Sequence, residues 1–479
     1  GGIEQGFLTN LETFEHSGLI TLADGAAGDL LVITDQADGA TPGGNVFTHD
    51  GGALALDVVL NDGVVDQSDV LILDKSVLGS GATTIFVSNA GGSGADTGTG
   101  DGIIVVNART ASAGNEFVLG NHPVAGAFQY DLFFQNQALT DQNWYLRSSF
   151  FEGALEYPAI VTGALLTWYS DLNPLHERLG EVRRETQEGE SAALPAVATA
   201  AGDTSAVRLG DAGQGGWLRV VGSDYDIDQS GPADFELDTV RAEVGLDVGF
   251  DNLFDEADWL VLGGFGGYGW SSVGFEQSSS DIDFNIATAG VYATYFRGPY
   301  YLDALVKFDW LDGDFNSDNV SDDGDVEIPV LGVSLETGYR FDLTEGGLYV
   351  QPQAQLVYAH SWDDSFKDDS GSRIDLEDAD SLRGRLGGRL GQELLSDSGE
   401  AKGNFYFEAS VLQEFLGDTD ATASGVNLDQ ELPGTTFEVG GGFEIALPKD
   451  GVTFTVDADY TFGDDAEGIG ATGGVRINW

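Results

Sequence analysis

The last thirty residues of the chain alternate apolar and polar side chains with a period of two. Between 452 and 462 the apolar members are Val452, Phe454, Val456, Ala458, Tyr460 and Phe462. Thr and Asp stand between them, and segment 468–479 repeats the pattern before the sequence stops on Trp479. Because neighbouring side chains of a β-strand point to opposite faces, each segment predicts a strand with one apolar and one polar face. Strands of about ten residues with this pattern are typical of outer-membrane β-barrels, although a soluble sandwich also alternates.

The same alternation fills the C-terminal half of the chain and predicts an antiparallel barrel. The expected strands are 215–222, 238–250, 257–268, 282–297, 300–311, 326–341, 347–362, 379–391, 403–416, 435–447, 451–463 and 468–479, which makes twelve. In the second strand, every second side chain from Val240 to Phe250 lies on an apolar face. Arg241, Glu243 and Asp247 lie between them, on the other face. Because charges on that second face exclude a dry core, we predict a twelve-stranded transmembrane barrel with a polar lumen.

The connections between these strands also fall into two classes. The tight ones are 297–299, 344–347 and 447–451, and the ones expected to be long acidic loops are 223–237, 312–325, 363–378 and 417–434. Short turns at one rim and long loops at the other are typical of outer-membrane barrels. This rule predicts that both ends of the barrel segment lie at the periplasmic rim.

Residues 1–148 are rich in Gly and Asp and hold short apolar runs bounded by turn residues. The runs are 30–35, 53–60, 69–74, 83–88 and 102–107. No helical period intervenes, so the pattern predicts stacked short strands in a β-solenoid, with a sandwich as the competing interpretation. Four aromatic side chains near its end are expected to cap the open core of the solenoid: Phe128, Tyr130, Trp144 and Tyr145.

A segment of different character separates the solenoid from the barrel. Residues 154–188 form the longest stretch with helical spacing, and Pro174 should kink or restart that helix. Residues 191–214 are mostly Ala, Gly, Ser and Asp, and we interpret them as a linker. The chain is therefore divided into a solenoid at 1–148, a helix with a linker at 149–214, and a barrel at 215–479.

Composition narrows the functions that remain open. The chain carries 80 acidic and 20 basic residues, a net charge of −60, which repels nucleic acid and argues against a polybasic membrane anchor. It has no Cys, and its five His residues show no metal-ligand spacing, so neither a metal site nor a cofactor is predicted. The sequence starts at Gly1 without a visible signal peptide, and we interpret it as a fragment or a mature C-terminal portion.

Five stretches, in this order, resemble the monomeric autotransporters of type V secretion, outer-membrane proteins that export their own passenger. They are LITLADGAAGDLLVI (19–33), AGAFQYDLFFQNQALTDQNWYLRSS (125–149), NPLHERLGEVR (173–183), GVYATYFRGPYYLDALVKF (290–308) and the terminal Trp479. They are similar, respectively, to passenger coils, to the junction that closes the passenger, to the linker helix, to a barrel hairpin and to the aromatic that the barrel-assembly machinery reads. The resemblance implies a right-handed β-solenoid passenger, an autochaperone junction and a translocator barrel with a helix in its lumen.

The resemblance also implies a mechanism and partners. The passenger crosses the barrel largely unfolded and folds outside from its C-terminal coils, whose stacking supplies the free energy without a nucleotide site. The implied partners are outer-membrane lipid and lipopolysaccharide, the barrel-assembly machinery and periplasmic chaperones. The protein is expected to be a monomer in the outer membrane, with residues 1–148 on the cell surface.

Basic residues of the predicted helix are candidates for contacts with the barrel wall. Arg178, Arg183 and Arg184 are expected to pair with lumenal carboxylates such as Glu243 and Asp247. A solvated helix face beyond the rim is the alternative for these three arginines.

The resemblance raises one possibility of self-processing. Asn173 occupies the position at which one subgroup of the family cleaves itself by asparagine cyclisation, but Pro174 departs from that subgroup's Asn-Asn pair. A helix N-cap followed by proline at the first helical position is the simpler interpretation. We therefore predict no enzyme activity, with self-cleavage as the one open question.

Two other functions compete with passenger export. A retained solenoid could itself be an adhesin or an autoaggregation surface, which is compatible with export. Alternatively, the barrel could be an enzyme or a solute pore. That alternative requires a convergent set of catalytic residues at one rim, and the sequence offers only the isolated segment DDSGS (368–372), which we interpret as a chance match to a serine-protease turn.

Overall fold

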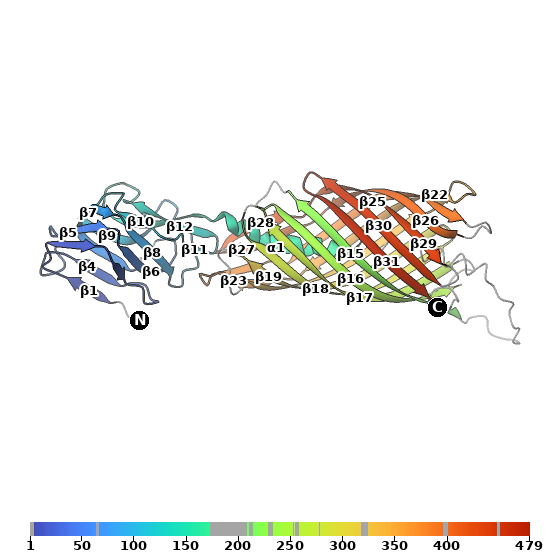
Figure 1. Cartoon of the computed structure of the whole chain (residues 1–479), viewed down its shortest axis with the longest axis horizontal. Helices are drawn as coiled ribbons and strands as arrows, with labels where there is room; N and C mark the ends of the chain where they lie inside the picture. Colours follow the sequence, from blue (N-terminus) through green and yellow to red (C-terminus); the bar gives the residue numbers. More distant parts are fainter. Residues whose placement is uncertain are drawn as a thin grey trace.

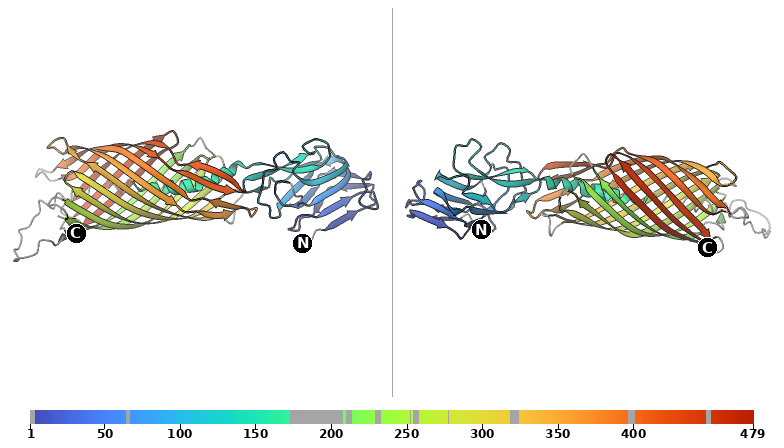
Figure 2. Two further views of the ribbon diagram at one scale, coloured as in Figure 1. Left: turned by 180° about the vertical axis from the view of Figure 1, so that it is seen from behind. Right: turned by 45° about the horizontal axis from the view of Figure 1, so that its top comes forward.

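The computed structural model describes residues 4–63, 67–172, 208–209, 214–228, 233–251, 253, 258–276, 278–317, 324–395, 401–447 and 451–479. They form a small stacked β domain at the N-terminal side and a long barrel at the C-terminal side, with a helix that enters the barrel from the end nearest the β domain (Figure 1). Views from other directions show the same end-to-end arrangement (Figure 2).

The N-terminal domain is a β-solenoid whose strands stack in parallel. One sheet contains β1 (Gln5–Leu8), β4 (Leu30–Ile33), β7 (Val70–Gly81) and β9 (Ile103–Ala111), and β2 (Thr13–His16) and β5 (Val46–Asp50) join it along the second half of β7. The other contains β3 (Leu19–Thr21), β6 (Ala53–Val58), β8 (Thr83–Asn89) and β10 (Phe117–Leu119). The predicted solenoid is confirmed and the sandwich interpretation is wrong, because equivalent strands of successive coils pair in parallel.

A column of aromatic rings runs through the solenoid core from coil to coil. Phe14 lies 5.5 Å from Phe47, whose neighbour His49 lies 4.6 Å from Phe117, and Phe117 lies 5.3 Å from Trp144, all as ring-centroid distances. Aliphatic side chains of the same coils are buried beside it. The column ties the first coil to the last one, and burial of each ring depends on the coil above or below it.

Antiparallel strands close the solenoid at the end nearest the barrel. They are β11 (Val124–Ala125), β12 (Phe128–Phe134) and β13 (Trp144–Phe150), and β13 pairs with β9. The change from parallel to antiparallel pairing ends the stack. Phe128, Tyr130, Trp144 and Tyr145 are all buried there, and the hydroxyl of Tyr130 donates to the main-chain oxygens of Asn61 and Ala95 at 3.0 and 3.1 Å.

Twelve antiparallel strands form the closed barrel. They are β15 (Gly215–Ile227), β16 (Phe235–Asp251), β17 (Asp258–Phe275), β18 (Asp281–Arg297), β19 (Tyr300–Asn316), β20 (Asp325–Tyr339), β22 (Leu348–Ser361), β25 (Ala379–Leu395), β26 (Ala401–Glu414), β29 (Thr435–Leu447), β30 (Val452–Gly463) and β31 (Glu467–Asn478). Pairing of β15 with β31 closes the ring, and two short strands, β14 (Arg208–Leu209) and β21 (Phe341–Asp342), pair with β16 and β22. All twelve predicted strands are present, and the C-terminus lies at the rim remote from the solenoid (Figure 1).

The long connections next to the solenoid are strands for much of their length, and their prediction as loops is wrong. β15 and β16 extend well into 223–237, and β19 extends into 312–325. Within 363–378 and 417–434 lie two hairpins, β23 (Asp364–Lys367) with β24 (Arg373–Leu376), and β27 (Asp418–Ala423) with β28 (Val426–Glu431). The four strands form one sheet in the order β23-β24-β27-β28. Phe366, Ile374 and Leu376 are buried on the inner face of this sheet. The acidic side chains on its outer face made these segments resemble solvated loops in the sequence.

The helical segment begins with a short 3₁₀ turn, η1 (Glu152–Leu155), and continues as α1 (Glu156–Tyr169) inside the barrel. Nearly every residue of α1 is buried, which is expected for a helix that is apolar all round and enclosed by a wall. Pro158 stands near its start, where its missing N–H group costs no helical hydrogen bond. Within the described residues, no helix has the length and hydrophobicity needed to cross a bilayer.

Candidate functional site: a barrel lumen filled by a helix

The polarity of the barrel wall reverses halfway along its strands. On β18, residues 281, 283 and 285 are acidic or amide side chains that point outward, while Ile282, Phe284 and Ile286 point inward and are buried. Further along the same strand Val291 points outward, and Thr288 and Thr294 point inward. The barrel therefore has an apolar interior next to the solenoid and a polar interior at the other end.

This reversal corrects the prediction of a polar lumen for the half of the barrel next to the solenoid. The half of the barrel next to the solenoid encloses α1, and a buried helix with apolar side chains on every face requires apolar partners. Strict alternation continues along β18 through the reversal, so its period is the same in both halves.

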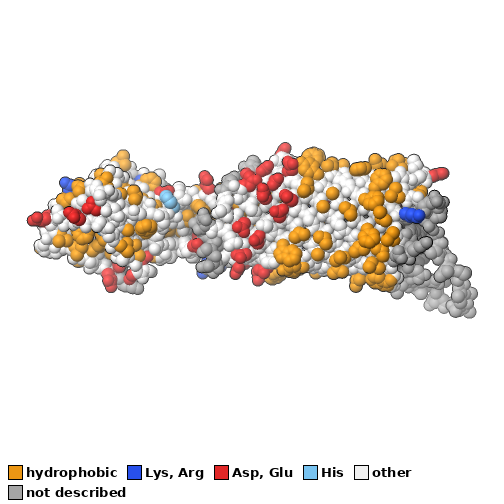
Figure 3. Space-filling model, viewed as in Figure 1, with side chains coloured by type: hydrophobic (Ala, Val, Ile, Leu, Met, Phe, Trp, Pro, Cys, Tyr) orange, Lys and Arg blue, Asp and Glu red, His pale blue; other side chains and the backbone are white. Residues whose placement is uncertain are grey.

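The outer surface shows the same division. Apolar side chains gather on the barrel half farther from the solenoid, and acidic side chains gather on the nearer half (Figure 3). Trp270 on β17, Trp310 on β19 and Trp362, directly after the end of β22, are exposed, as in the aromatic girdles of outer-membrane barrels. Strands β16 and β18 have 17 residues each, whereas about 9–11 suffice to cross the hydrocarbon layer. The acidic half therefore extends beyond the lipid on the solenoid side.

Aromatic side chains form a collar around the first turns of α1. The ring of Tyr157 lies 5.6 Å from Phe366 and 6.1 Å from Phe315, measured between centroids, and Phe315 lies 5.7 Å from Phe366. Gly163 sits so close to the wall that a Cβ there would lie 2.8 Å from a methyl group of Val273. The collar fills the space between helix and wall with close-packed side chains at the end of the barrel next to the solenoid.

Two cations of the barrel wall hold the other end of α1. Lys307 Nζ donates to the main-chain oxygen of Trp168 at 2.6 Å, and Arg241 donates to the main-chain oxygen of Thr167. Both cations also contact two carboxylates, Asp171 after the helix and Asp309 on β19, with Arg241 Nη1 2.6 Å from Asp309 Oδ2.

All four charged side chains of this cluster are buried, and their formal charges cancel. The last carbonyls of a helix lack helical partners and carry partial negative charge, so cations are stabilising there. The cluster fixes the depth of α1 in the lumen because it contacts both the helix end and the wall.

Aromatic residues of the last helical turn add contacts with further wall cations. Lys307 Nζ lies 4.8 Å from the centroid of the Trp168 ring, and the guanidinium carbon of Arg383 lies 3.8 Å from that of Tyr169. The Tyr169 hydroxyl lies 2.7 Å from Ser381 Oγ. Gly332 on β20 faces Trp168, and a Cβ at this position would overlap the indole ring. The wall therefore complements the helix in two ways: its cations contact the aromatic rings, and Gly332 leaves space for the indole of Trp168.

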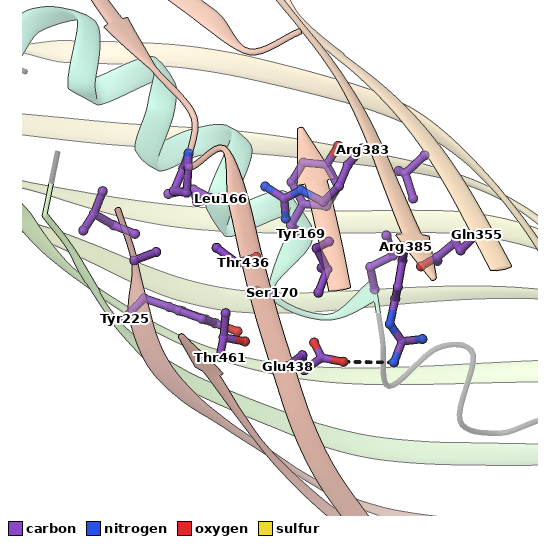
Figure 4. Close-up of a pocket in the computed structure, with 16 residues that line it drawn as sticks. Leu166, Tyr169, Ser170, Tyr225, Gln355, Arg383, Arg385, Thr436, Glu438 and Thr461 are labelled. Atoms are coloured by element: carbon purple, nitrogen blue, oxygen red, sulfur yellow. Dashed lines mark hydrogen bonds and ion pairs between the residues drawn. The ribbon is translucent and has the colours of Figure 1, made fainter. Parts of the chain in front are cut away.

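A cavity of about 70 Å³ remains between the end of α1 and the wall. Figure 4 shows Tyr169 and Arg383 on one side of it and Tyr225, Thr461 and Glu438 on the other, with Arg385 Nη2 donating to Glu438 Oε1 at 2.9 Å. Apolar and polar side chains both line it, and its volume suits a few water molecules next to the polar ones. The cavity lies beside the end of α1, against the solenoid-side ends of several barrel strands, including Tyr225 near the end of β15 and Thr436 near the start of β29.

The predicted pairing of helix arginines with the wall stays a prediction. Arg178, Arg183, Arg184 and Asn173 lie outside the described residues. Their expected partners are placed on β16: the carboxylate of Glu243 accepts a hydrogen bond from Arg219 Nε at 2.6 Å. Asp247 accepts from both terminal nitrogens of Arg476 at 2.7 and 2.8 Å and from the Tyr292 hydroxyl at 2.8 Å.

Trp479 lies at the rim remote from the solenoid and is 68% exposed. Its main-chain N–H donates to the oxygen of Gln214 at 3.2 Å, next to the start of β15. The indole ring is therefore presented outward beside the seam at which the first and last barrel strands pair.

Sequence reasoning placed Arg241 on the inner face but gave it no role, and it did not single out Lys307. The available signal was a Lys or Arg at an inward position of an otherwise neutral or apolar strand stretch, as in ALVKF at 304–308. Such a cation requires an acceptor inside the barrel, and a helix end supplies one.

The geometry defines a class: an outer-membrane type of β-barrel whose lumen is occupied by a helix continuous with an external β-solenoid. Residues 216–459 match the family described as autotransporter beta-domain, and residues 43–132 match the autochaperone domain type 1. The first match covers half of the chain, so this chain belongs to the autotransporter β-domain family, and its barrel is an outer-membrane barrel.

Curated relatives agree with this assignment. The pertactin autotransporter of Bordetella parapertussis is 30% identical over 301 residues, which cover 61% of this chain and 29% of that protein. The adhesin BmaC autotransporter of Brucella suis is 26% identical over 503 residues, 97% of this chain and 14% of that protein. This chain thus spans less than a third of the length of either relative. Among solved structures, the β domain of the Bordetella autotransporter BrkA aligns with 56% of this chain and all of its own, with 20% identity and a TM-score of 0.45.

Proposed function

We propose that this chain is the translocation unit of an autotransporter, which inserts in the outer membrane and carries its own solenoid to the cell surface. The observation that supports the proposal is one continuous path. The chain leaves the last solenoid strand, β13, turns through η1 and runs into the barrel as α1. A segment that joins an external domain to the inside of a pore is what remains when a chain has been exported through that pore.

The collar and the charged cluster give α1 a second role as a plug. The aromatic collar around Tyr157 closes the external mouth of the barrel, and Arg241 and Lys307 stop the helix at one depth. A plug held in this way keeps the outer membrane sealed after export. The four charges of the cluster are buried as a neutral set, so movement of the helix in either direction would separate Asp171 from Arg241 and Lys307.

The solenoid supplies the driving force in this proposal. Residues 43–132 form its coils nearest the barrel, and their rings and aliphatic side chains are buried only when successive coils stack. Folding of these coils outside the barrel makes return through the lumen unfavourable, since the apolar area buried would have to be exposed again. Each further coil then adds to an existing edge.

The expected partners follow from the same proposal. The barrel-assembly machinery would read Trp479, periplasmic chaperones would hold the unfolded chain, and lipopolysaccharide would contact the apolar band and its aromatic rim. The unit acts as a monomer and performs no catalysis, with cleavage at Asn173 as a separate question for a mass measurement on outer membranes.

Export is tested on intact cells that express this chain with a secretion signal. Proteinase K added from outside should remove or nick residues 4–150 and leave the barrel intact. Deleting 1–148 should still give a stable barrel in the membrane but should abolish efficient display of a reporter fused before residue 149. A solenoid that stays inaccessible in intact cells and becomes accessible only after lysis would overturn the proposal.

A second function, adhesion or autoaggregation, is favoured by one exposed surface of the solenoid. On the outer face of the sheet β3-β6-β8-β10, Leu19, Phe86 and Val118 are 66%, 44% and 45% exposed. Leu19 and Val118 lie in one register row with Ala53 and Thr84 between them, and Phe86 lies in the next row of the same face. Exposed apolar side chains that share one face of a sheet are candidates for an interaction surface. Replacing all three by Ser should reduce the rate at which expressing cells aggregate and sediment, and unchanged sedimentation would leave export as the sole function.

A further inference from the structure

A groove crosses the outer face of the barrel where strands β16, β17 and β18 lie side by side. Its volume is about 550 Å³, and its outward-facing lining consists of Asp238, Val240, Trp270, Ser272, Asp283 and Asn285. The groove exists because β17 carries small residues beyond Trp270. Ser272 is followed at the next outward position by Gly274, where a Cβ would meet no atom within 4 Å. Larger side chains on the two neighbouring strands form its walls.

The register of the three strands brings the polar lining together. Asp238 pairs with Ser272, and Ser272 pairs with Asp283, so the two aspartates lie on opposite sides of the serine. In the next row toward the apolar band, Trp270 pairs with Asn285. Because neighbouring strands are about 5 Å apart, the Cα atoms of Asp238 and Asp283 are roughly 10 Å from each other. Their carboxylates therefore lie beside a common space above Ser272.

Two aromatic side chains order the part of the groove nearest the apolar band. Trp270 is 56% exposed, and its ring stands edge-to-face with that of Tyr268, at 5.3 Å between centroids. The Tyr268 hydroxyl donates a hydrogen bond of 3.2 Å to Asn285 Oδ1, which leaves the amide N–H groups of Asn285 as donors for another molecule. The indole face and the amide are therefore held in position before a ligand binds.

The charge of the groove suits a cation. Among the described residues, neither Asp238 nor Asp283 has a Lys or Arg partner. The basic residues of β16, β17 and β18 are Arg241, which is buried in the lumen, and Arg297, at the remote end of β18. An anion would be repelled here, whereas an ammonium group is attracted by both carboxylates and by the face of a Trp ring.

The height of the groove on the barrel indicates the source of such an ammonium group. On the same three strands, outward-facing Val244, Leu262 and Val291 belong to the apolar band, and the acidic half begins beyond Trp270 (Figure 3). The two aspartates lie one row past Trp270, which is about 7 Å along a strand. The headgroup layer on each side of the hydrocarbon is roughly 5–8 Å thick, and Trp rings gather at that level. The carboxylates are therefore at the height of lipid headgroups.

We propose that this groove binds the phosphoethanolamine headgroup of a lipid in the surrounding membrane, with its ammonium group held by Asp238, Asp283 and the face of Trp270. The phosphate of the same headgroup then accepts hydrogen bonds from the Ser272 hydroxyl and the Asn285 amide. The groove gives the barrel a preference for one class of headgroup among the lipids that contact it. The proposal requires that the barrel lies in a membrane, and it does not depend on export.

The test uses the purified full chain in an uncharged polyoxyethylene detergent. Native mass spectrometry measures how many lipid molecules remain bound as the lipid concentration rises. The probes are dihexanoylphosphatidylethanolamine and dihexanoylphosphatidylglycerol, which have equal acyl chains and differ in the ammonium group. The wild type should bind the first lipid roughly five-fold more tightly than the second, as expected for a partly desolvated contact of an ammonium with an aromatic ring.

Two variants remove the proposed contacts one kind at a time. Trp270→Ala removes the aromatic face, and the double variant Asp238→Asn with Asp283→Asn removes the negative charge; each should abolish the preference for phosphatidylethanolamine. Trp270→Phe should keep part of it. The matched control is Trp310→Ala, which removes a Trp that is 40% exposed on β19, outside the groove. Heat-modifiable migration shows that each variant is folded.

The outcomes decide the proposal. A preference that is lost in Trp270→Ala and in the double variant but persists in Trp310→Ala supports the groove. Equal binding of the two lipids by the wild type overturns it, and so does a preference that both groove variants retain. Displacement of the lipid by the same concentration of free ethanolamine would identify a soluble amine as the occupant and would overturn the assignment to a lipid.

Discussion

The ammonium group of Lys307, on the barrel wall, donates a hydrogen bond of 2.6 Å to the main-chain oxygen of Trp168, in the last turn of the lumenal helix. These residues are 139 positions apart in the chain. Their contact shows which partner supplies the charge: the wall contributes the cations and the helical segment contributes carbonyl oxygens and Asp171. The polarity is opposite to that of a basic helix held by an acidic wall, which remains the expectation for the arginines beyond residue 172.

Replacing Lys307 by Met should destabilise the helix-filled barrel strongly. The change leaves Asp171 and Asp309 buried with Arg241 as their remaining cation in this cluster, and breaking a buried charge set by removing one partner costs about 3–5 kcal/mol. The expected loss is measured by equilibrium unfolding in detergent micelles. Lys367→Met on the exposed edge of β23 is the control and should change stability by less than about 0.5 kcal/mol. Equal stability of the two variants would mean that the cluster does not hold the helix.

Gly332 tests the steric match between wall and helix. A Cβ at this position would overlap the Trp168 ring, so Gly332→Ala should force the indole or the strand to move and should destabilise the protein by about 1–3 kcal/mol. Gly473→Ala on β31 is the matched control, because a Cβ there would meet no atom within 4 Å. The stability of both variants is measured as the temperature at which the barrel loses its compact migration in gel electrophoresis. If this temperature falls as much in Gly473→Ala as in Gly332→Ala, the loss of stability comes from replacing glycine in a strand and not from the contact with the helix.

Leu246 tests which side of the barrel faces lipid. It is 62% exposed in the apolar band, and Leu246→Arg should cost about 2–4 kcal/mol if that band lies in the hydrocarbon layer. Asp238→Arg on the same strand lies in the acidic half beyond the lipid and should be tolerated. Refolding into lipid vesicles, followed by denaturant titration, measures both variants. Tolerance at Leu246 would place the membrane elsewhere on the barrel.

The strands were predictable from sequence because their signal is local. Each alternates with a period of two over ten or more residues, and even the reversal of wall polarity on β18, between Phe284 and Val291, leaves that alternation intact. For the same reason the reversal itself was not predictable, since the period does not say which face is inside. The reversal depends on whether a helix occupies the lumen at that height, and this is determined by the tertiary structure.

The contacts that hold the helix were not predictable for a related reason. Lys307 and Trp168 meet through the closure of the whole barrel, and neither residue type is unusual in a strand or a helix. The segment after β23 illustrates the same limit: the N–H of Gly126 in the solenoid donates a hydrogen bond of 2.7 Å to Asp368, and the two residues are 242 positions apart. From the sequence, the acidic segment around Asp368 was indistinguishable from a solvated loop. Periodicity identified the elements, whereas the site depends on how they close around one another.

A final prediction concerns acid and the solenoid core. His49 is buried between Phe47 and Phe117, at ring-centroid distances of 4.8 and 4.6 Å, with Nδ1 2.8 Å from Thr83 Oγ1. Burial lowers its pKa from 6.5 to about 4, although the nearby carboxylate of Glu116 opposes the change. The folded solenoid therefore holds His49 neutral, while the unfolded chain takes up a proton as the pH falls below 6.5.

It follows that the stability contributed by neutral His49 is fully present above pH 6.5 and is lost progressively as the pH falls toward 4, because the unfolded state binds more protons in that interval. The rate at which external protease cuts residues 4–150 should rise over the same interval. His49→Phe keeps a ring in the column and cannot be protonated, so its pH dependence between 6.5 and 4 should be flatter than that of the wild type. His122→Gln, which removes an exposed imidazole paired with Asp131, should keep the wild-type profile. Identical profiles for wild type and His49→Phe would show that another group, such as His16, whose pKa burial also lowers, governs the response to acid.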